Sequence, residues 1–186
     1  LVSCPAIIIA GSGEDEELAF PEDPDWRALD RAEALARIKE AGVVGLGGAA
    51  FPTWRKLDLP PTLSIDTFIL NGAECEPYLT SDYRTMLAHP REVVEGALAM
   101  ARLVGARRLA IGLESDKADA APPLKAALEE ALAASGARGL HGDVQLCEVR
   151  YPQGAERQLV TALTGRIVPP RGLPSAVKVV VQTVAT

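Results

Sequence analysis

Aromatic residues are scarce in this chain of 186 residues, and positive charge does not predominate. Phe, Trp and Tyr together make up 4% of the sequence, which is too few for a series of base-stacking platforms. The formal net charge is −6, and a negative chain has no broad electrostatic attraction to nucleic acid. No apolar run is long enough to cross a bilayer. We therefore predict no nucleic-acid partner and no direct membrane span.

Cysteine and histidine are also few and widely spaced. Cys4, Cys75 and Cys147 form no CxxC pair, so the chain encodes neither an iron–sulfur site nor a structural zinc site. His89 and His141 have no neighbouring ligands or nucleophiles, and we expect both to be surface or loop residues. The sequence also lacks a Walker loop. Metal-dependent, hydrolase and kinase functions therefore have little support.

Apolar residues make up 48% of the chain, enough for one domain with a real core. Their periodicity predicts strands that alternate with helices. The predicted strands are 6–10, 67–70, 107–113, 144–149 and 177–184, and the predicted helices are 25–41, 83–104 with a break near His89-Pro90, 119–135 and 153–163. This order predicts a layered α/β fold with a mainly parallel sheet. In such sheets ligands bind beyond the carboxyl ends of the strands.

The most informative stretch runs from Gly45 to Lys56 and reads GLGGAAFPTWRK. Gly45, Gly47 and Ala50 match the spacing of a dinucleotide-binding fingerprint. We reject that interpretation because the fingerprint lies between a strand and a helix, whereas here a helix comes first. The glycines instead predict an irregular glycine loop (residues 45–50) whose N–H groups face a ligand, with Lys56 available to neutralise a phosphate. The alternative is an ordinary helix-to-strand turn.

Two polar turns follow predicted strands. Asn71, Glu74 and Glu76 come after the strand at 67–70, where acidic groups can bind ribose hydroxyls. A solvated turn is the alternative. Residues 151–156 lie before a helix, whose first N–H groups suit an anion or a ring carbonyl; a plain capped helix is the alternative. We interpret Cys75 as structural. Together with the glycine loop, these turns predict a flavin site with acidic groups beside it for a second ligand.

These motifs resemble the C subunit of the Rnf-type (Rsx) membrane electron-transport complex and, more distantly, the flavin-and-NADH subunit of respiratory complex I. The resemblance covers nearly the whole chain and rests on VSCP at 2–5, GVVGLGGAAFPTWRKL at 42–57, ILNGAECEPYLTSDYR at 69–84, LAIGLESDK at 109–117, YPQGAERQLVTALTGRIVP at 151–169 and VVVQTVAT at 179–186. It implies a Rossmann-like layered α/β fold of the complex I flavin-subunit type. Residues 1–186 would form one FMN/NADH-binding domain, a fragment without the flanking iron–sulfur domains of the full-length protein.

The resemblance also implies a set of binding residues. The implied FMN contacts are Gly45, Gly47, Gly48, Lys56, Asn71, Gly154, Gln182 and Thr183, and the implied NADH contacts are Phe51, Glu74, Glu76, Tyr151 and Glu156. Hydride transfer between NADH and FMN would be followed by electron transfer to 4Fe-4S clusters that only the full-length protein holds. No side chain is implied as a catalytic acid or base, since the flavin supplies the redox chemistry.

The resemblance further implies other subunits of the electron-transport complex as partners and a peripheral place on the cytoplasmic side of the bacterial inner membrane. Two alternatives stay open. A cobalamin-reductase-type flavoprotein shares the same core, and a non-catalytic scaffold would keep the fold without the flavin. Ala50 and Ala155 stand where the family usually has glycine, and Thr183 where it usually has asparagine. These departures are the reason that the non-catalytic scaffold stays open as an alternative function.

Overall fold

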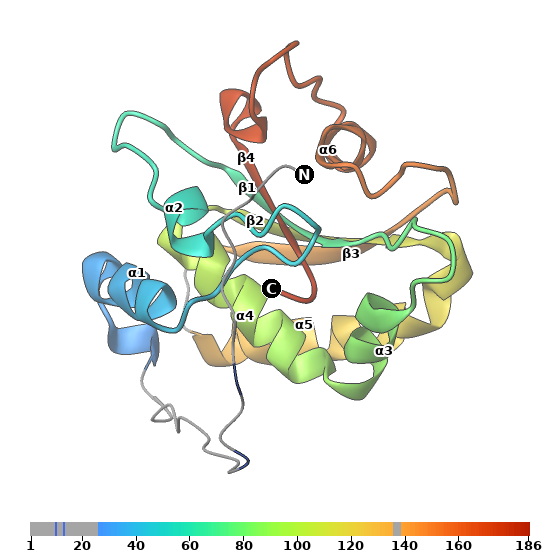
Figure 1. Cartoon of the computed structure of the whole chain (residues 1–186), viewed down its shortest axis with the longest axis horizontal. Helices are drawn as coiled ribbons and strands as arrows, with labels where there is room; N and C mark the ends of the chain where they lie inside the picture. Colours follow the sequence, from blue (N-terminus) through green and yellow to red (C-terminus); the bar gives the residue numbers. More distant parts are fainter. Residues whose placement is uncertain (1–9, 11–12, 14–25, 136–138) are drawn as a thin grey trace.

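The computed structural model describes residues 10, 13, 26–135 and 139–186. Its centre is a sheet of four parallel strands in the order β3-β2-β1-β4 (Figure 1). The strands are β1 (Thr67–Gly72), β2 (Arg108–Glu114), β3 (His141–Cys147) and β4 (Val179–Thr183). The predicted parallel sheet is thus confirmed in the described part of the chain. Residues 6–9 of the first predicted strand lie outside the described residues.

Helices cover both faces of the sheet (Figure 1). One face carries α3, α4 and α5, and the other carries α6. The helical elements are η1 (Trp26–Ala28), α1 (Arg31–Glu40), α2 (Thr53–Leu57), α3 (Ser81–Ala88), α4 (Pro90–Leu103), η2 (Ser115–Ala120), α5 (Ala121–Ser135), α6 (Glu156–Thr164) and η3 (Pro174–Val177), where η marks a 3₁₀ helix. This is the predicted layered α/β architecture.

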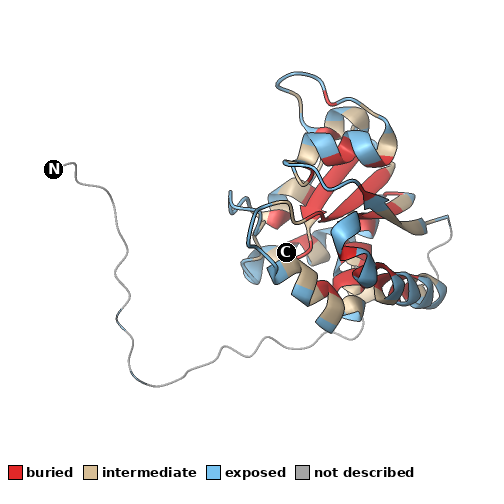
Figure 2. Cartoon of the chain, turned by 90° about the vertical axis from the view of Figure 1, so that its right-hand side faces the viewer, coloured by how far each residue is buried: buried red, intermediate tan, exposed pale blue. Residues whose placement is uncertain are grey.

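Alternation along β1 divides the core between the two faces. Phe68 and Leu70 belong to the apolar cluster that contains α4 and α5, whereas Ile69 belongs to the cluster that contains α6. Successive side chains of a strand point to opposite faces, so both faces of β1 need apolar residues. Every residue of β1 is buried, as expected for a parallel strand covered on both sides. The strands accordingly form the buried layer between the helices in Figure 2.

Local signals set several helix ends. The helix predicted at 25–41 is two helices, because Asp30 caps the start of α1 in a capping box with Glu33. The predicted break near Pro90 is confirmed, since this proline occupies the first turn of α4. Gly165 ends α6 in the left-handed conformation, with φ of +69°.

Several elements differ from the prediction, and three of the differences have a clear physical cause. Helix α2 was not predicted because its five residues are too few for a periodic pattern. Helix α6 begins at Glu156, three residues later than predicted, because residues 151–154 form a turn. Strand β3 begins at His141 rather than at 144, because this edge strand is only half buried and its polar start carries no apolar signal.

Two partly buried ion pairs join the ends of elements. Arg108 binds Asp143 in a bidentate fashion, with Nε–Oδ1 at 2.8 Å and Nη2–Oδ2 at 2.9 Å. Arg166 binds Asp66 through Nη1–Oδ1 at 2.7 Å. Burial alone would raise the pKa of each carboxyl, but the guanidinium hydrogen bonds and charges outweigh burial and hold both pKa values below the usual range. The native state therefore releases these protons more readily than the unfolded chain does.

Acid should weaken the fold through these carboxylates. Their stabilisation is present above the unfolded aspartate pKa of about 3.9 and is lost as the pH falls through the lower folded values. We expect the urea midpoint of the wild-type chain to drop between about pH 5 and pH 2, and that of Asp143→Asn to drop less, because this variant cannot take up the proton. Glu130→Gln, in an exposed pair with Arg91, is the control and should follow the wild type. Identical acid profiles for wild type and Asp143→Asn would contradict the prediction.

Candidate functional site

The glycine loop projects from a short antiparallel junction between α1 and α2. Val44 and Pro52 form an isolated bridge, and Gly45 N–H donates to the carbonyl oxygen of Phe51 at 2.8 Å. The loop backbone from 46 to 50 is exposed, with Gly48 at φ +106° and Ala50 at φ +47°. The preceding element is the helix α1, so the structure supports the rejection of the dinucleotide fingerprint.

The end of β4 lies against the glycine loop, as the implied FMN contacts require. A Cβ atom on Gly47 would lie 3.1 Å from Cγ2 of Thr183, and one on Gly45 would lie 3.7 Å from Nε2 of Gln182. The strand and the loop can approach this closely because the loop carries glycines at these positions. The structure therefore brings four of the implied FMN residues together from two distant segments.

The side-chain amide of Gln182 has a hydrogen-bond acceptor that no described residue uses. Its side chain is 3% exposed, and its Nε2 donates to Oγ1 of Thr53 at 3.3 Å. Its Oε1 is buried without a hydrogen-bond partner among the described residues. A buried polar atom without a partner is costly unless something else satisfies it. This orphan oxygen next to the glycine loop is a candidate acceptor for a hydrogen bond from a ligand.

Two hydroxyl groups at the glycine loop were missed by sequence reasoning. Thr186 Oγ1 accepts from Leu46 N–H at 3.4 Å and lies 2.9 Å from Thr183 Oγ1. Thr53, 1% exposed, holds the amide of Gln182 as described above. The signal for Thr53 was its place directly after Phe51-Pro52, at the first position of a helix too short to detect by periodicity.

Lys56 and Glu156 form an ion pair across the site. They come from α2 and from the first turn of α6, 100 residues apart in sequence, and Nζ lies 2.5 Å from Oε1. Lys56 is therefore tied to the site rather than free on the surface. The pair joins a residue implied for FMN to one implied for NADH, so a ligand that engages either group must compete with the other.

Asn71 connects the end of β1 to the turn before α6. Its Nδ2 donates to the carbonyl oxygen of Gly154 at 2.8 Å, and its Oδ1 accepts from Ala73 N–H at 3.1 Å. Gly154 N–H donates to Sγ of Cys75 at 3.3 Å, which agrees with the structural role expected for this cysteine. A Cβ on Gly154 would lie 2.3 Å from the carbonyl oxygen of Ala73, so only glycine fits.

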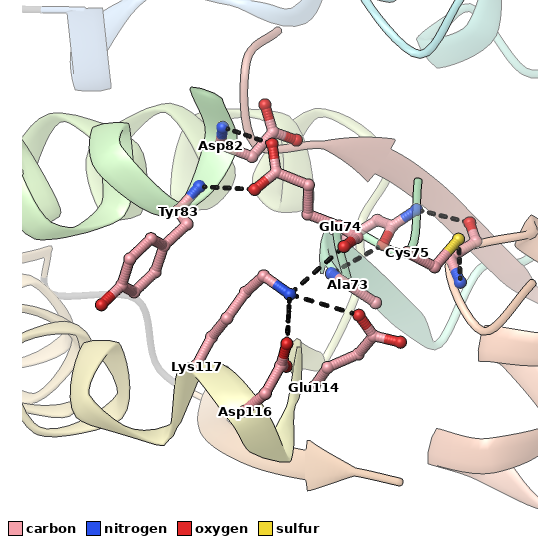
Figure 3. Close-up of polar contacts among 10 residues, drawn as sticks. Ala73, Glu74, Cys75, Asp82, Tyr83, Glu114, Asp116 and Lys117 are labelled. Atoms are coloured by element: carbon pink, nitrogen blue, oxygen red, sulfur yellow. Dashed lines mark hydrogen bonds and ion pairs between the residues drawn. The ribbon is translucent and has the colours of Figure 1, made fainter. Parts of the chain in front are cut away.

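The residues implied for NADH divide into engaged and exposed groups. The carboxylate of Glu74 accepts from the N–H groups of Asp82 at 3.0 Å and Tyr83 at 3.3 Å, and so caps the start of α3 (Figure 3). Burial, and then the charge of Glu74, raise the pKa of Asp82. Three members of the set are exposed instead and can meet a ligand from solvent: Phe51, Glu76 and Tyr151.

Two surface cavities lie elsewhere, along α6. They measure about 400 and 330 Å³ and share two lining residues, Ala162 and Gln153, the neighbour of Gly154. Neither is lined by the glycine loop or by β4. Within the described part of the chain, no group of three or more His, Cys, Asp or Glu side chains is placed to hold a metal ion. His89 and His141 are exposed, as expected.

Fold and site together define a class of protein. The carboxyl edge of a parallel sheet presents a glycine loop, a lysine and an amide oxygen without a partner in the described part of the chain. This is the arrangement expected for a nucleotide-type cofactor-binding α/β domain. Comparison with known sequences is more specific. The chain belongs to the family of the Nuo51 FMN-binding domain, whose sequence model matches residues 38–186.

Curated relatives agree with this family. The chain is 44% identical over 184 residues to the C subunit of the proton-translocating ferredoxin:NAD(+) oxidoreductase complex of Clostridium ljungdahlii, covering 98% of this chain and 38% of the relative. It is 43% identical over 165 residues to the C subunit of the Na(+)-translocating ferredoxin:NAD(+) oxidoreductase complex of Acetobacterium woodii, covering 89% and 34%. The chain thus spans little more than a third of the length of these relatives. The resemblance to Rnf-type C subunits is confirmed.

Solved structures confirm the fold. The NAD+-reducing [NiFe]-hydrogenase in its H2-reduced state matches with a TM-score of 0.74 and 27% identity, over 84% of this chain and 29% of that chain. The air-oxidized state of such a hydrogenase matches with a TM-score of 0.70 and 26% identity. The layered α/β fold of the complex I flavin-subunit type is therefore the fold of this chain.

Proposed function

We propose that this chain binds FMN at the glycine loop and supports hydride transfer between NADH and FMN, with electrons passing on to iron–sulfur clusters outside these residues. The observation that carries the proposal is the buried Oε1 of Gln182 beside the glycine loop, which has no hydrogen-bond partner among the described residues. Membership of the FMN-binding family supports it. The names of the C-subunit relatives and of the hydrogenase, all of which involve NAD+, support the choice of dinucleotide.

The donors and acceptors of this site fit FMN. The flavin carries N–H and hydroxyl donors, carbonyl acceptors and a phosphate. Gln182 Oε1 would accept a hydrogen bond, the glycine positions of the loop would approach without a side chain of their own, and Lys56 would supply positive charge. When bound, FMN can take up a hydride and release electrons singly. The protein's part is to bind and orient, and no side chain need act as an acid or base.

Three exposed side chains suit NADH. Phe51 offers an aromatic surface, 51% exposed, and Tyr151 offers another, 72% exposed. Glu76 offers an exposed carboxylate of the kind that binds ribose hydroxyls. Glu74 would contribute through the turn that it stabilises, and Glu156 through its pair with Lys56. These residues would hold the nicotinamide end against the flavin.

The relatives' names also bear on partners and place. Because those proteins are subunits of ion-translocating complexes, we propose that this chain works with other such subunits as a peripheral component on the cytoplasmic side of the bacterial inner membrane. The 4Fe-4S clusters would belong to parts of the full-length protein beyond these residues. None of the described helices has the length and apolarity of a membrane span.

A non-catalytic scaffold is the second candidate, and specific contacts favour it. Lys56 is already neutralised by Glu156, and both the amide and the carbonyl group of the Asn71 side chain are engaged. Ala50 adopts φ of +47°, which strains a non-glycine residue in the glycine loop. A scaffold would keep these internal contacts and bind no flavin.

An FMN titration of the 186-residue chain separates the two candidates. We expect saturable quenching of flavin fluorescence by the wild type. Lys56→Ala should weaken FMN binding by about tenfold or more, because a charge-assisted hydrogen bond contributes about 1.5–3 kcal/mol. Arg55→Ala is the matched control: it removes an exposed charge from the same helix and should leave the affinity within about twofold. NADH should then bleach the bound flavin.

Two outcomes would count against the proposed flavin site. Absence of quenching by a wild-type chain shown by circular dichroism to be folded would favour the scaffold. Equal losses in Lys56→Ala and Arg55→Ala would mean that general positive charge, and not the specific position of Lys56, attracts FMN.

A further inference from the structure

A buried lysine lies against the acidic turn (residues 73–77) and has no role in the site described so far (Figure 3). Lys117 is 8% exposed. Its Nζ donates to the carbonyl oxygen of Glu74 at 3.2 Å, to the Asp116 carboxylate at 3.1 and 3.2 Å, and to Oε2 of Glu114 at 3.4 Å. An ammonium group has three donors, so these three partners use its full capacity.

Glu114 accounts for the presence of a lysine at this place. It is the last residue of β2, is 1% exposed, and its Oε1 has no partner among the described residues. A buried carboxylate needs a counter-charge, which Lys117 supplies. Burial opposes the charge on Lys117, but hydrogen bonds and charges from Asp116 and Glu114 outweigh burial and raise the pKa of Lys117. The lysine therefore stays charged at neutral pH.

The contacts of Glu74 belong to a ring of contacts that includes this lysine. Figure 3 shows the part that runs from Lys117 through Glu74 to the start of α3. The main chain of Glu74 is held by Lys117, and its carboxylate accepts from Asp82 and Tyr83 at the start of α3. The hydroxyl of Tyr83 donates to Oδ2 of Asp119 in η2, at 2.7 Å, and η2 also carries Lys117. The acidic turn is thus fixed from both sides by one connected set of contacts.

Glu76 is the carboxylate that lies outside this ring. It lies two residues after Glu74 on the same turn, it is exposed, and Pro77 restricts the backbone that follows it. We propose that Lys117 is a positioning residue, which holds the peptide of Glu74 so that Glu76 points its carboxylate toward the ribose hydroxyls of NADH. This inference rests on the proposed function. Lys117 itself would touch neither NADH nor the flavin.

The kinetic test follows NADH oxidation by the FMN-loaded chain, with an artificial one-electron acceptor in excess to reoxidise the flavin. The double variant Lys117→Met/Glu114→Gln removes both buried charges, so neither is left without its partner. We expect its KM for NADH to rise about tenfold while kcat and the FMN affinity stay within about twofold, the signature of weakened substrate placement. Lys117→Arg keeps the charge and the hydrogen-bond donors, so its KM for NADH should stay close to the wild-type value. Lys125→Met, an exposed lysine of α5, is the control and should match the wild type.

A second readout needs no flavin. The N–H groups of Asp82 and Tyr83 donate to Glu74, so their hydrogen exchange reports how firmly the acidic turn is held. We expect both amides to exchange at least about tenfold faster in the folded double variant and to be unchanged in Lys125→Met. Unchanged exchange overturns the positioning role whether or not flavin binds, and so does faster exchange with an unchanged KM. A wild-type chain that binds no FMN overturns the proposed function instead, and the exchange rates still decide the role of Lys117.

Discussion

Replacing Gly154 with alanine should lower the free energy of unfolding by about 3 kcal/mol, among the largest effects of any single methyl group in this chain. The added Cβ would lie 2.3 Å from the carbonyl oxygen of Ala73 and 3.1 Å from Sγ of Cys75. Backbone atoms cannot rotate away as a flexible side chain can. The turn before α6 must therefore move off the end of β1, and the hydrogen bond from Asn71 to the Gly154 carbonyl is lost or lengthened.

Urea unfolding followed by circular dichroism measures this loss. Gly96→Ala is the matched control, because Gly96 lies inside α4 with nothing within 4 Å of an added Cβ. That variant should gain about 0.5–1 kcal/mol from the higher helix propensity of alanine. A Gly154→Ala chain as stable as the wild type would mean that the two turns are not packed as closely as described. Because the displaced turn borders the proposed flavin site, FMN affinity should fall together with stability.

Much of the fold could be predicted because its signals are local. The strand from Thr67 is a continuous apolar run, as a doubly covered parallel strand must be. Pro90 and Gly165 mark helix ends by backbone chemistry that any context preserves. Where the signal is weak, as in the half-buried edge strand β3, the predicted bounds were displaced.

The candidate site could be predicted only as a set of segments. Glycine spacing predicts the loop as a binding segment, and the strand ends predict Asn71 and the acidic turn. No local pattern could pair Lys56 with Glu156, since the contact spans 100 residues. The need for glycine at position 154 could likewise not be predicted, because it depends on how closely the carbonyl of Ala73 approaches. The sequence shows which chemical groups are present, but the geometry of these groups depends on tertiary packing.

The ion pair between Lys117 and Glu114 leads to the second large effect. Lys117→Met should lower the free energy of unfolding by about 3–5 kcal/mol, because it leaves the carboxylate of Glu114 buried without its counter-charge. Glu114 is 1% exposed, and within the described part of the chain the only donor to its carboxylate is Nζ of Lys117. Asp116, by contrast, has a half-exposed side chain and can turn to water when the lysine is lost.

The double variant Lys117→Met/Glu114→Gln identifies the cause. If the stranded charge is responsible, neutralising Glu114 should restore most of the lost stability, and the double variant should unfold in urea near the wild-type midpoint. If packing of the lysine stem is responsible, the two substitutions should instead add, and the double variant should be the least stable of the set. An additive result would remove the electrostatic account of this cluster. A restored double variant would show that the pair of charges contributes little net stability, so its value to the protein must lie in holding the carbonyl of Glu74 and the acidic turn.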